Sequence, residues 1–336
     1  MKLLIAYDGS ECAESALDDL THAGLPAKGE ALVMTVAEVW LPPPPPSAQE
    51  IVQLAVDVKG PLGLERKYMA APQSVVEADK TAEKAAARFQ ANFPHWKVKH
   101  ESSWGSPNVE LFLKAEEWKA DLIVAGSHGR SALGRIFLGS ISQWLLNEAK
   151  CSIRIARGHV DEPDFPVRVI VGVDGSRNAN AAVNEIAKRN WPLRSEFRAV
   201  AVNQPLEPTV VGELVPPITR SVEECNKEDR QAALRLATSA AKRLKANGLR
   251  AEALAVNGEP KRVLVQLAEE WRADCIFIGA TGLSNRLERF LLGSVAGAVA
   301  ARAHCSVEIV RTRKRKRLTL LQVSGINSRL PKITNL

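Results

Sequence analysis

The chain has 336 residues, which suits two domains of ordinary size, and its 46% apolar and 25% charged residues are typical of a globular protein. Residues 311–336 hold eight basic and no acidic residues, so subtracting 8 from the net charge of +7 leaves about −1 for residues 1–310. The net charge of the chain therefore does not indicate a nucleic-acid-binding fold. Five scattered cysteines without a CxxC pattern, and the lack of any long apolar stretch, argue against disulfides, a zinc site and a membrane span, and predict a cytoplasmic protein.

The first half of the chain alternates short apolar runs with helical patterns. The first run, in MKLLIAYDGS, is too short for the core of a signal peptide and is predicted to be a strand. Five prolines at 42–46 predict a polyproline-like loop, either a stiff surface loop or a ligand for a proline-binding domain. We expect strands at 2–7, 31–39, 98–103, 121–125 and 151–156. We expect helices at 10–23, 75–93, 108–119 and 140–149.

The second half shows the same alternation. Residues 158–166 (GHVDEPDFP) are acidic and contain proline, which predicts a linker between the halves. A milder proline-bearing loop is expected at 205–217. We expect strands at 167–173, 197–203, 251–256, 275–278 and 305–310, and long or amphipathic helices at 222–246, 261–272 and 294–303.

The two halves are copies of one module. AEEWKADLIVAG (115–126) and AEEWRADCIFIG (268–279) are identical at eight of twelve positions, and FLGSISQWLLNEAKCSIRIAR (137–157) matches LLGSVAGAVAARAHCSVEIVR (291–311). Alternating strands and helices with nearly continuous apolar strands predict a parallel sheet covered on both faces. The predicted fold is therefore α/β, with two doubly wound five-stranded parallel-sheet domains at 1–157 and 167–311, followed by a basic tail at 312–336.

Glycines follow a predicted buried strand in the first half. Gly126 and Gly129 come after that strand, and Gly139 and Ser140 open the next helix. Glycines permit close backbone approach, and free N–H groups there and at a helix N-terminus can bind an anion. Asp8, which ends the first strand beside Ser10, could accept a hydrogen bond from an amino group or a ribose hydroxyl. In the alternative interpretation, Asp8 and Ser10 only cap a helix and the glycines only form turns.

The pattern Gly126-x2-Gly129-x9-Gly139-Ser140, with Asp8-Gly9-Ser10 after the first strand, resembles the nucleotide signature of the universal stress protein family. The resemblance covers nearly all of residues 1–311 as a tandem pair. It implies a Rossmann-like fold of the adenine nucleotide alpha hydrolase-like kind, with strand order 3-2-1-4-5 and binding of ATP in some members. It also implies that the two halves pack through their fifth strands as an internal pseudo-dimer, and that the chain could form a homodimer.

By the same resemblance, each signature residue has an implied role. Asp8 would meet the adenine or ribose, and Val36 would offer its backbone to the base. Ribose and phosphates would be held by Gly126, Gly129, Gly139, Ser140 and Ile141. His128 and Arg130 could approach a phosphate or remain solvated loop side chains.

The second half departs from this pattern by one residue. Asp174, Val202 and Ser294 keep their places, and Gly279-x2-Gly282 matches, but ten residues rather than nine precede Gly293. The extra residue could form a bulge, or it could displace the following helix by up to ~3.5 Å. We expect nucleotide binding in the first half and weaker binding in the second. The second-half residues expected to bind are Asp174, Val202, Gly279, Gly282, Gly293, Ser294 and Val295.

No catalytic machinery is evident. The sequence has no P-loop, no GxGxxG after the first strand, no GxSxG and no HExxH, and its six histidines lack ligand spacing. We name no catalytic or metal-ligating residue, and expect Mg²⁺ to arrive with the nucleotide. The favoured function is an ATP-binding sensor that acts on an unknown protein partner. A slow ATPase or phosphotransfer enzyme and an interaction scaffold without nucleotide are the alternatives.

Two further features lie outside the signature. Cys151 and Cys305 open the fifth strand of each half and are expected to be small core residues, and Trp118 and Trp271 are expected to pack on the sheet. RTRKRKR (311–317) is either a solvated extension or a tether to RNA, DNA or an anionic membrane surface.

Overall fold

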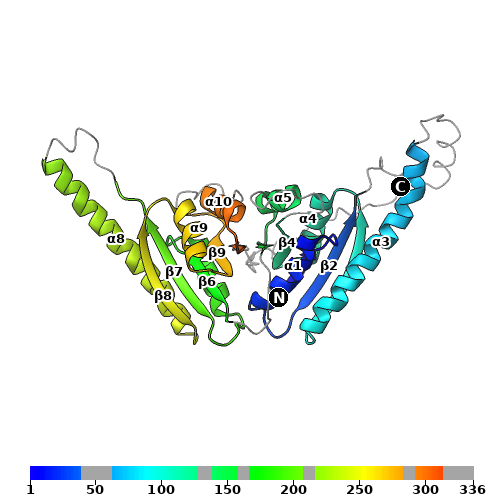
Figure 1. The fold of residues 1–336 in the computed structure, drawn as a ribbon, viewed down its shortest axis with the longest axis horizontal. Helices are drawn as coiled ribbons and strands as arrows, with labels where there is room; N and C mark the ends of the chain where they lie inside the picture. Colours follow the sequence, from blue (N-terminus) through cyan, green and yellow to red (C-terminus); the bar gives the residue numbers. More distant parts are fainter. Residues whose placement is uncertain (39–62, 128–137, 158–165, 207–215, 283–291, 313–336) are drawn as a thin grey trace, which may run out of the picture.

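Ten strands form one continuous sheet with helices on both faces (Figure 1). This computed structural model describes residues 1–38, 63–127, 138–157, 166–206, 216–282 and 292–312. The predictions for the five prolines at 42–46, for nearly all of the linker and of the 205–217 loop, and for the tail beyond Thr312 lie outside these residues.

The first half contains the predicted alternation of five strands and four long helices, in the parts of the chain that the structure describes. Ser10 caps the first helix, which ends earlier than predicted and tightens into a 3-10 turn. The helix predicted at 75–93 begins well before residue 75 and includes Pro72. The elements are β1 (Lys2–Ala6), α1 (Glu11–Asp19), η1 (Leu20–His22), β2 (Glu30–Ala37), α3 (Gly63–Asn92), β3 (Lys97–Trp104), α4 (Pro107–Trp118), β4 (Leu122–Gly126), α5 (Ser140–Glu148) and β5 (Ser152–Ala156).

The second half repeats this order. No bounds were predicted for the first helix of this half. Ser176 caps this helix in the same way as Ser10 caps α1. The elements are β6 (Arg168–Gly172), α6 (Arg177–Ala187), β7 (Glu196–Asn203), α8 (Pro216–Lys245), β8 (Arg250–Asn257), α9 (Pro260–Glu270), β9 (Cys275–Gly279), α10 (Ser294–Arg302) and β10 (Ser306–Val310).

The strand order of the sheet is β3-β2-β1-β4-β5-β10-β9-β6-β7-β8. Neighbouring strands are parallel within each half, and β5 pairs with β10 in antiparallel orientation. The expected order 3-2-1-4-5 is thus confirmed in both halves, and so is packing through the fifth strands. Because the strands of the two halves run in opposite directions, their carboxyl ends lie at opposite edges of the sheet.

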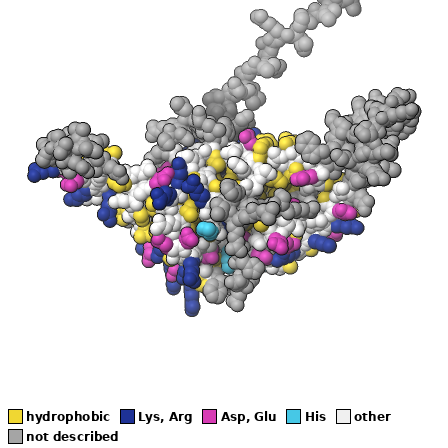
Figure 2. All heavy atoms as spheres, turned by 45° about the horizontal axis from the view of Figure 1, so that its top comes forward, with side chains coloured by type: hydrophobic (Ala, Val, Ile, Leu, Met, Phe, Trp, Pro, Cys, Tyr) yellow, Lys and Arg dark blue, Asp and Glu magenta, His cyan; other side chains and the backbone are white. Residues whose placement is uncertain are grey.

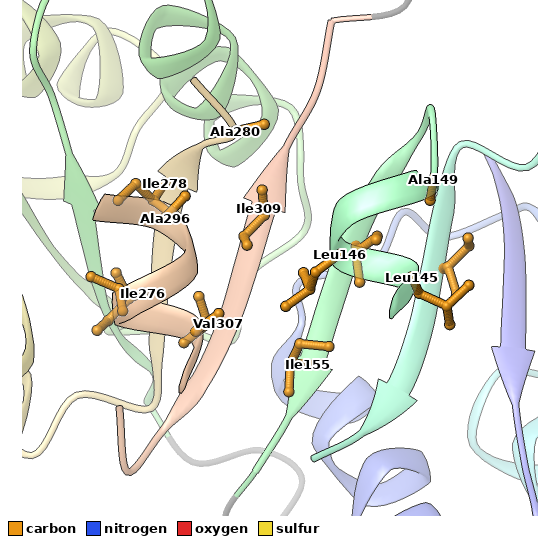
Figure 3. Packing of buried hydrophobic residues seen from close by; sticks show 14 of the residues in the cluster. Leu145, Leu146, Ala149, Ile155, Ile276, Ile278, Ala280, Ala296, Val307 and Ile309 are labelled. Atoms are coloured by element: carbon orange, nitrogen blue, oxygen red, sulfur yellow. The ribbon is translucent and has the colours of Figure 1, made fainter. Parts of the chain in front are cut away.

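One apolar core spans both halves on the face covered by α4, α5, α9 and α10. Ile153 and Ile155 of β5 and Val307 and Ile309 of β10 all belong to it, as expected for alternate residues of a strand. Figure 3 shows Ile155 facing Val307, with Leu145 and Leu146 of α5 above. On the opposite face, the first half and the second half have separate cores. The two halves therefore share apolar packing on one face only.

Several smaller expectations can be compared with the structure. Cys151 is buried, and Cys305 is partly buried against the shared core, where burial raises its pKa to about 12. Both residues directly precede the fifth strand rather than opening it. Trp118 and Trp271 pack against the shared core as predicted. Acidic and basic side chains are interspersed over the face shown in Figure 2. None of the helices in the described residues has the length and hydropathy of a membrane span.

Candidate functional site

A cavity of about 360 Å³ opens at the carboxyl edge of β6, β7 and β9. In the sheet, β6 has β7 on one side and β9 on the other, so the strand order reverses at β6. Ligands bind at this position in open α/β sheets. The structure brings all of the predicted second-half residues together in its lining: Asp174, Val202, Gly279, Gly282, Gly293, Ser294 and Val295.

Asp174 is held in place by the loop that follows β6. Its Oδ1 accepts a hydrogen bond from the backbone N–H of Ser176 at 2.9 Å. The other carboxylate oxygen, Oδ2, faces Gly282, where an added Cβ would lie only 2.7 Å away. Gly282 therefore leaves room for the carboxylate at the mouth of the cavity. Among the cavity-lining residues that the structure describes, Asp174 is the one charged residue.

Gly279 ends β9 directly beneath the first turn of α6. A Cβ at this position would lie 2.6 Å from the backbone nitrogen of Ala179 and 2.7 Å from the carbonyl carbon of Asn178. The side chain of Asn178 in turn donates to the hydroxyl of Thr281 at 2.6 Å, and Thr312 donates to the Asn178 oxygen. Thr281 and Asn178 were missed in the sequence, because the first half has His128 and Cys12 at these repeat positions.

The N-terminus of α10 faces the same cavity. Ser294, Val295 and Ala296 form its first turn and line the cavity, and Gly293 caps the helix without a side-chain hydrogen bond. The first N–H groups of a helix lack partners within the helix and carry a partial positive charge. Such a helix start is chemically able to hold an anion.

The extra residue of the second half does not displace this helix. The N–H of Gly293 donates to Ala280 at 2.7 Å, and the N–H of Gly139 donates to the equivalent Ser127 at 2.8 Å. The two capping glycines also have nearly equal backbone angles, at φ −63° and ψ 146° against φ −60° and ψ 152°. Of the two alternatives for the extra residue, a displacement of the helix start by up to ~3.5 Å does not occur in the described residues, since the same hydrogen bond anchors both helix starts.

The strands beside the cavity leave backbone groups open where the sequence suggested contacts to a base. Val173 donates to the carbonyl of Val200, so the N–H and C=O of Val200 point toward β6. Two residues later, those of Val202 point the same way, but β6 has ended at Gly172. Val36 is placed alike, because Tyr7 donates to Met34 and β1 ends at Ala6.

The first half repeats the described part of this arrangement. Asp8 accepts from the N–H of Ser10 at 3.0 Å, and a Cβ on Gly126 would lie 2.7 Å from the carbonyl oxygen of Cys12. The hydroxyl of Ser10 accepts from Ala13 at 3.2 Å, so it has the helix-capping role of the alternative interpretation. Gly139, Ser140 and Ile141 begin α5, as their counterparts begin α10. His128, Gly129 and Arg130 lie outside the described residues.

The cavity has an apolar and a polar end. Val200, Leu264 and Ile278 supply apolar surface, whereas Ala280 to Gly282 and the start of α10 present backbone groups. No cluster of three or more His, Cys, Asp or Glu that could hold a metal is found in the described part of the chain. The described lining offers binding groups and a single carboxylate.

Comparison with known proteins assigns the chain to a family. The model of the universal stress protein family matches twice, at residues 1–157 and 167–311. The chain belongs to the universal stress protein family. Universal stress protein MJ0531 of Methanocaldococcus jannaschii is 37% identical over 95 residues, which are 28% of this chain and 54% of that protein. The chain thus spans about half the length of this curated relative.

Other universal stress proteins match over longer stretches. Universal stress protein Rv2005c of Mycobacterium tuberculosis is 29% identical over 223 residues, covering 64% of this chain and 69% of that one. A crystal structure of a universal stress protein from Archaeoglobus fulgidus covers 92% of this chain and 98% of its own, with a TM-score of 0.62 and 20% identity. That likeness shows that the fold of the tandem arrangement is shared.

Proposed function

We propose that this universal stress protein binds an adenine nucleotide, ATP with its Mg²⁺, and acts as a sensor module rather than as an efficient enzyme. The observation that carries the proposal is the cavity at the carboxyl edge of β6, β7 and β9, which is lined by both Asp174 and the start of α10. The matching arrangement of Asp8, Gly126 and Gly139 extends the proposal to the first half.

The chemistry of the lining fits the parts of a nucleotide. The open backbone groups of Val202 can pair with the edge of a base that packs on Val200, Leu264 and Ile278. The carboxylate of Asp174 can accept hydrogen bonds from ribose hydroxyls. The N–H groups of Gly282 and of the first turn of α10 suit phosphates, and Mg²⁺ would be held by those phosphates.

A regulatory role is favoured over hydrolysis by the charges of the described lining. Phosphoryl transfer needs a positioned base or water-orienting group together with cationic stabilisation of the phosphate. Asp174 is the one charged group in the described part of this lining, and its Oδ1 accepts the bond from Ser176. We infer that nucleotide occupancy is transmitted to a partner protein through α10, whose first turn lines the cavity.

The test combines nucleotide release with titration of the emptied protein. Freshly purified protein is denatured, and released nucleotide is identified by chromatography and mass spectrometry. Nucleotide-free protein is then titrated with Mg-ATP by calorimetry, with AMP and cAMP as competitors, because solved universal stress proteins hold these two ligands. We expect one or two ATP sites per chain.

Matched variants assign each site to one half. Asp8→Asn and Asp174→Asn both keep the Oδ1 acceptor of the loop but replace the second oxygen with an N–H group, so each should weaken one site. If neither release nor titration detects a nucleotide, the scaffold alternative holds instead. If ADP accumulates at a rate well above background, the enzyme alternative holds.

A further inference from the structure

We call the β5–β10 ladder and the residues that contact across it the seam between the halves. One repeat position in this seam has a positive side chain in the first half and a negative one in the second. Arg154 and Glu308 occupy the same repeat position, in CSIRIAR and CSVEIVR. They are also directly paired in the ladder, where Ile153 pairs with Ile309 and Ile155 with Val307. The pseudo-two-fold axis that relates the halves therefore passes through the Arg154–Glu308 pair.

Both side chains are completely buried and belong to one ionic network. Arg154 donates from Nε and Nη2 to the two carboxylate oxygens of Asp19, at 2.6 and 2.9 Å. Across the seam, its Nη1 reaches Oε2 of Glu308 at 3.4 Å. Burial disfavours the charged guanidinium, but Asp19 and Glu308 outweigh it and hold the pKa of Arg154 well above its ordinary value. Glu308 is also bridged by Arg189, so two cations meet two anions.

A second pair of repeat positions meets across the seam and differs in size. Arg189 occupies the position of Ala23, and its Nη1 donates to the carbonyl of Ala23 at 2.9 Å. Next to it, the N–H of Asn190 donates to Gly24 at 3.0 Å. The ring of Trp191 lies against Gly24 so closely that a Cβ there would be 2.7 Å from it. Large residues of the second half thus fill space that small residues of the first half leave.

We propose that Arg154 and Glu308, with Arg189 and Trp191 packed against Ala23 and Gly24, make the seam selective for one first half joined to one second half. Two first halves would bring two Arg154 guanidinium groups face to face, each paired only with the Asp19 of its own half, and would leave a void at Ala23 and Gly24. Two second halves would bring two Glu308 carboxylates face to face, each bridged only by the Arg189 of its own half, and would force two Arg189–Trp191 segments into one space. Like charges at a buried contact disfavour the wrong pairing, as do overlapping or missing volumes.

Selectivity explains the network better than stability does. A buried ion pair is seldom more stabilising than well-packed apolar residues of the same volume, yet it excludes partners that lack the complementary charge. The shared core on the other face offers no comparable discrimination, because the apolar residues that pair there are alike in both halves: Ile153, Ile155, Val307 and Ile309. The charged face of the seam therefore decides which modules pair.

The test lets the halves choose their partners while the whole chain is present. A protease site is placed within residues 159–165, the linker is cut, and the nicked protein is unfolded in urea, refolded by dilution and analysed by native mass spectrometry. We expect unlike pairs to outnumber each like pair by at least about tenfold. A statistical mixture of like and unlike pairs would overturn the proposal.

A second measurement on the uncut chain applies if the nicked protein does not refold. Arg154→Met and Glu308→Met are made singly and together, and urea unfolding gives the coupling between them. The losses of stability in the two single variants should add up to more than the loss in the double variant. We expect this difference, the coupling, to be at least about fivefold in the unfolding equilibrium constant. Purely additive effects would show that the two charges do not recognise each other across the seam, and would overturn the proposal.

Discussion

Gly282→Ala isolates the contact on which the second-half site depends. Gly282 has no positive φ, so alanine can adopt its backbone conformation. The new Cβ would lie 2.7 Å from Oδ2 of Asp174 and must reach at least about 3.4 Å, so the carboxylate has to move by about 0.7 Å. A ligand hydrogen bond to this carboxylate would then be lost. Such a bond to a charged group contributes about 1.5–3 kcal/mol, which is about a 10- to 150-fold loss of affinity.

The assay is calorimetric titration with Mg-ATP in the Asp8→Asn background, so that binding at the second half dominates the signal. Gly172→Ala is the matched control, because it adds the same methyl group to the same cavity. Its Cβ would meet the flexible Leu264 side chain at 3.3 Å instead of Asp174. We expect the control to change the affinity by less than about threefold.

The combination with Asp174→Asn decides whether the mechanism is right. If Gly282→Ala acts by displacing the carboxylate, the two substitutions together should weaken binding no more than the worse single one. An unchanged Kd in Gly282→Ala, or losses that simply add in the combined variant, would refute the reasoning.

Three further predictions concern packing and reactivity. Gly279→Ala forces a methyl group against the backbone of α6, so the free energy of unfolding in urea should fall by about 1–3 kcal/mol; a neutral effect would mean that α6 moves aside freely. Because burial raises the pKa of Cys305 to about 12, iodoacetamide at pH 8 should modify exposed Cys225 at least about tenfold faster, and peptide mass spectrometry would reveal equal rates if this is wrong. Arg311→Ala should lower the melting temperature, because Arg311 donates to two carbonyls at the end of α5. Its repeat counterpart Arg157 has no partner for Nε and Nη1 among the described residues, so Arg157→Ala should lower the melting temperature less. Equal losses in the two variants would contradict this.

The sequence predicted the elements well where apolar periodicity is strong. All ten strands lie within one or two residues of their predicted bounds, because alternating or continuous apolar runs encode them locally. The bounds failed where periodicity is weak, as at the start of α3 and at the end of α1, where the chain tightens into η1. The seven predicted second-half site residues meet at one cavity because the strand ends and the helix start that carry them lie at one edge of the sheet.

The sequence by itself determined that this universal stress protein is one α/β module written twice, and which residues stand at the strand ends. Only the tertiary structure decided that the extra residue before Gly293 leaves the start of α10 in place, because a hydrogen bond to Ala280 anchors it. It alone decided that Arg154 meets Glu308. The sequence shows that the two residues have opposite charges at the same repeat position. Whether these charges pair depends on which strands are adjacent, and strand adjacency is a long-range property of the fold.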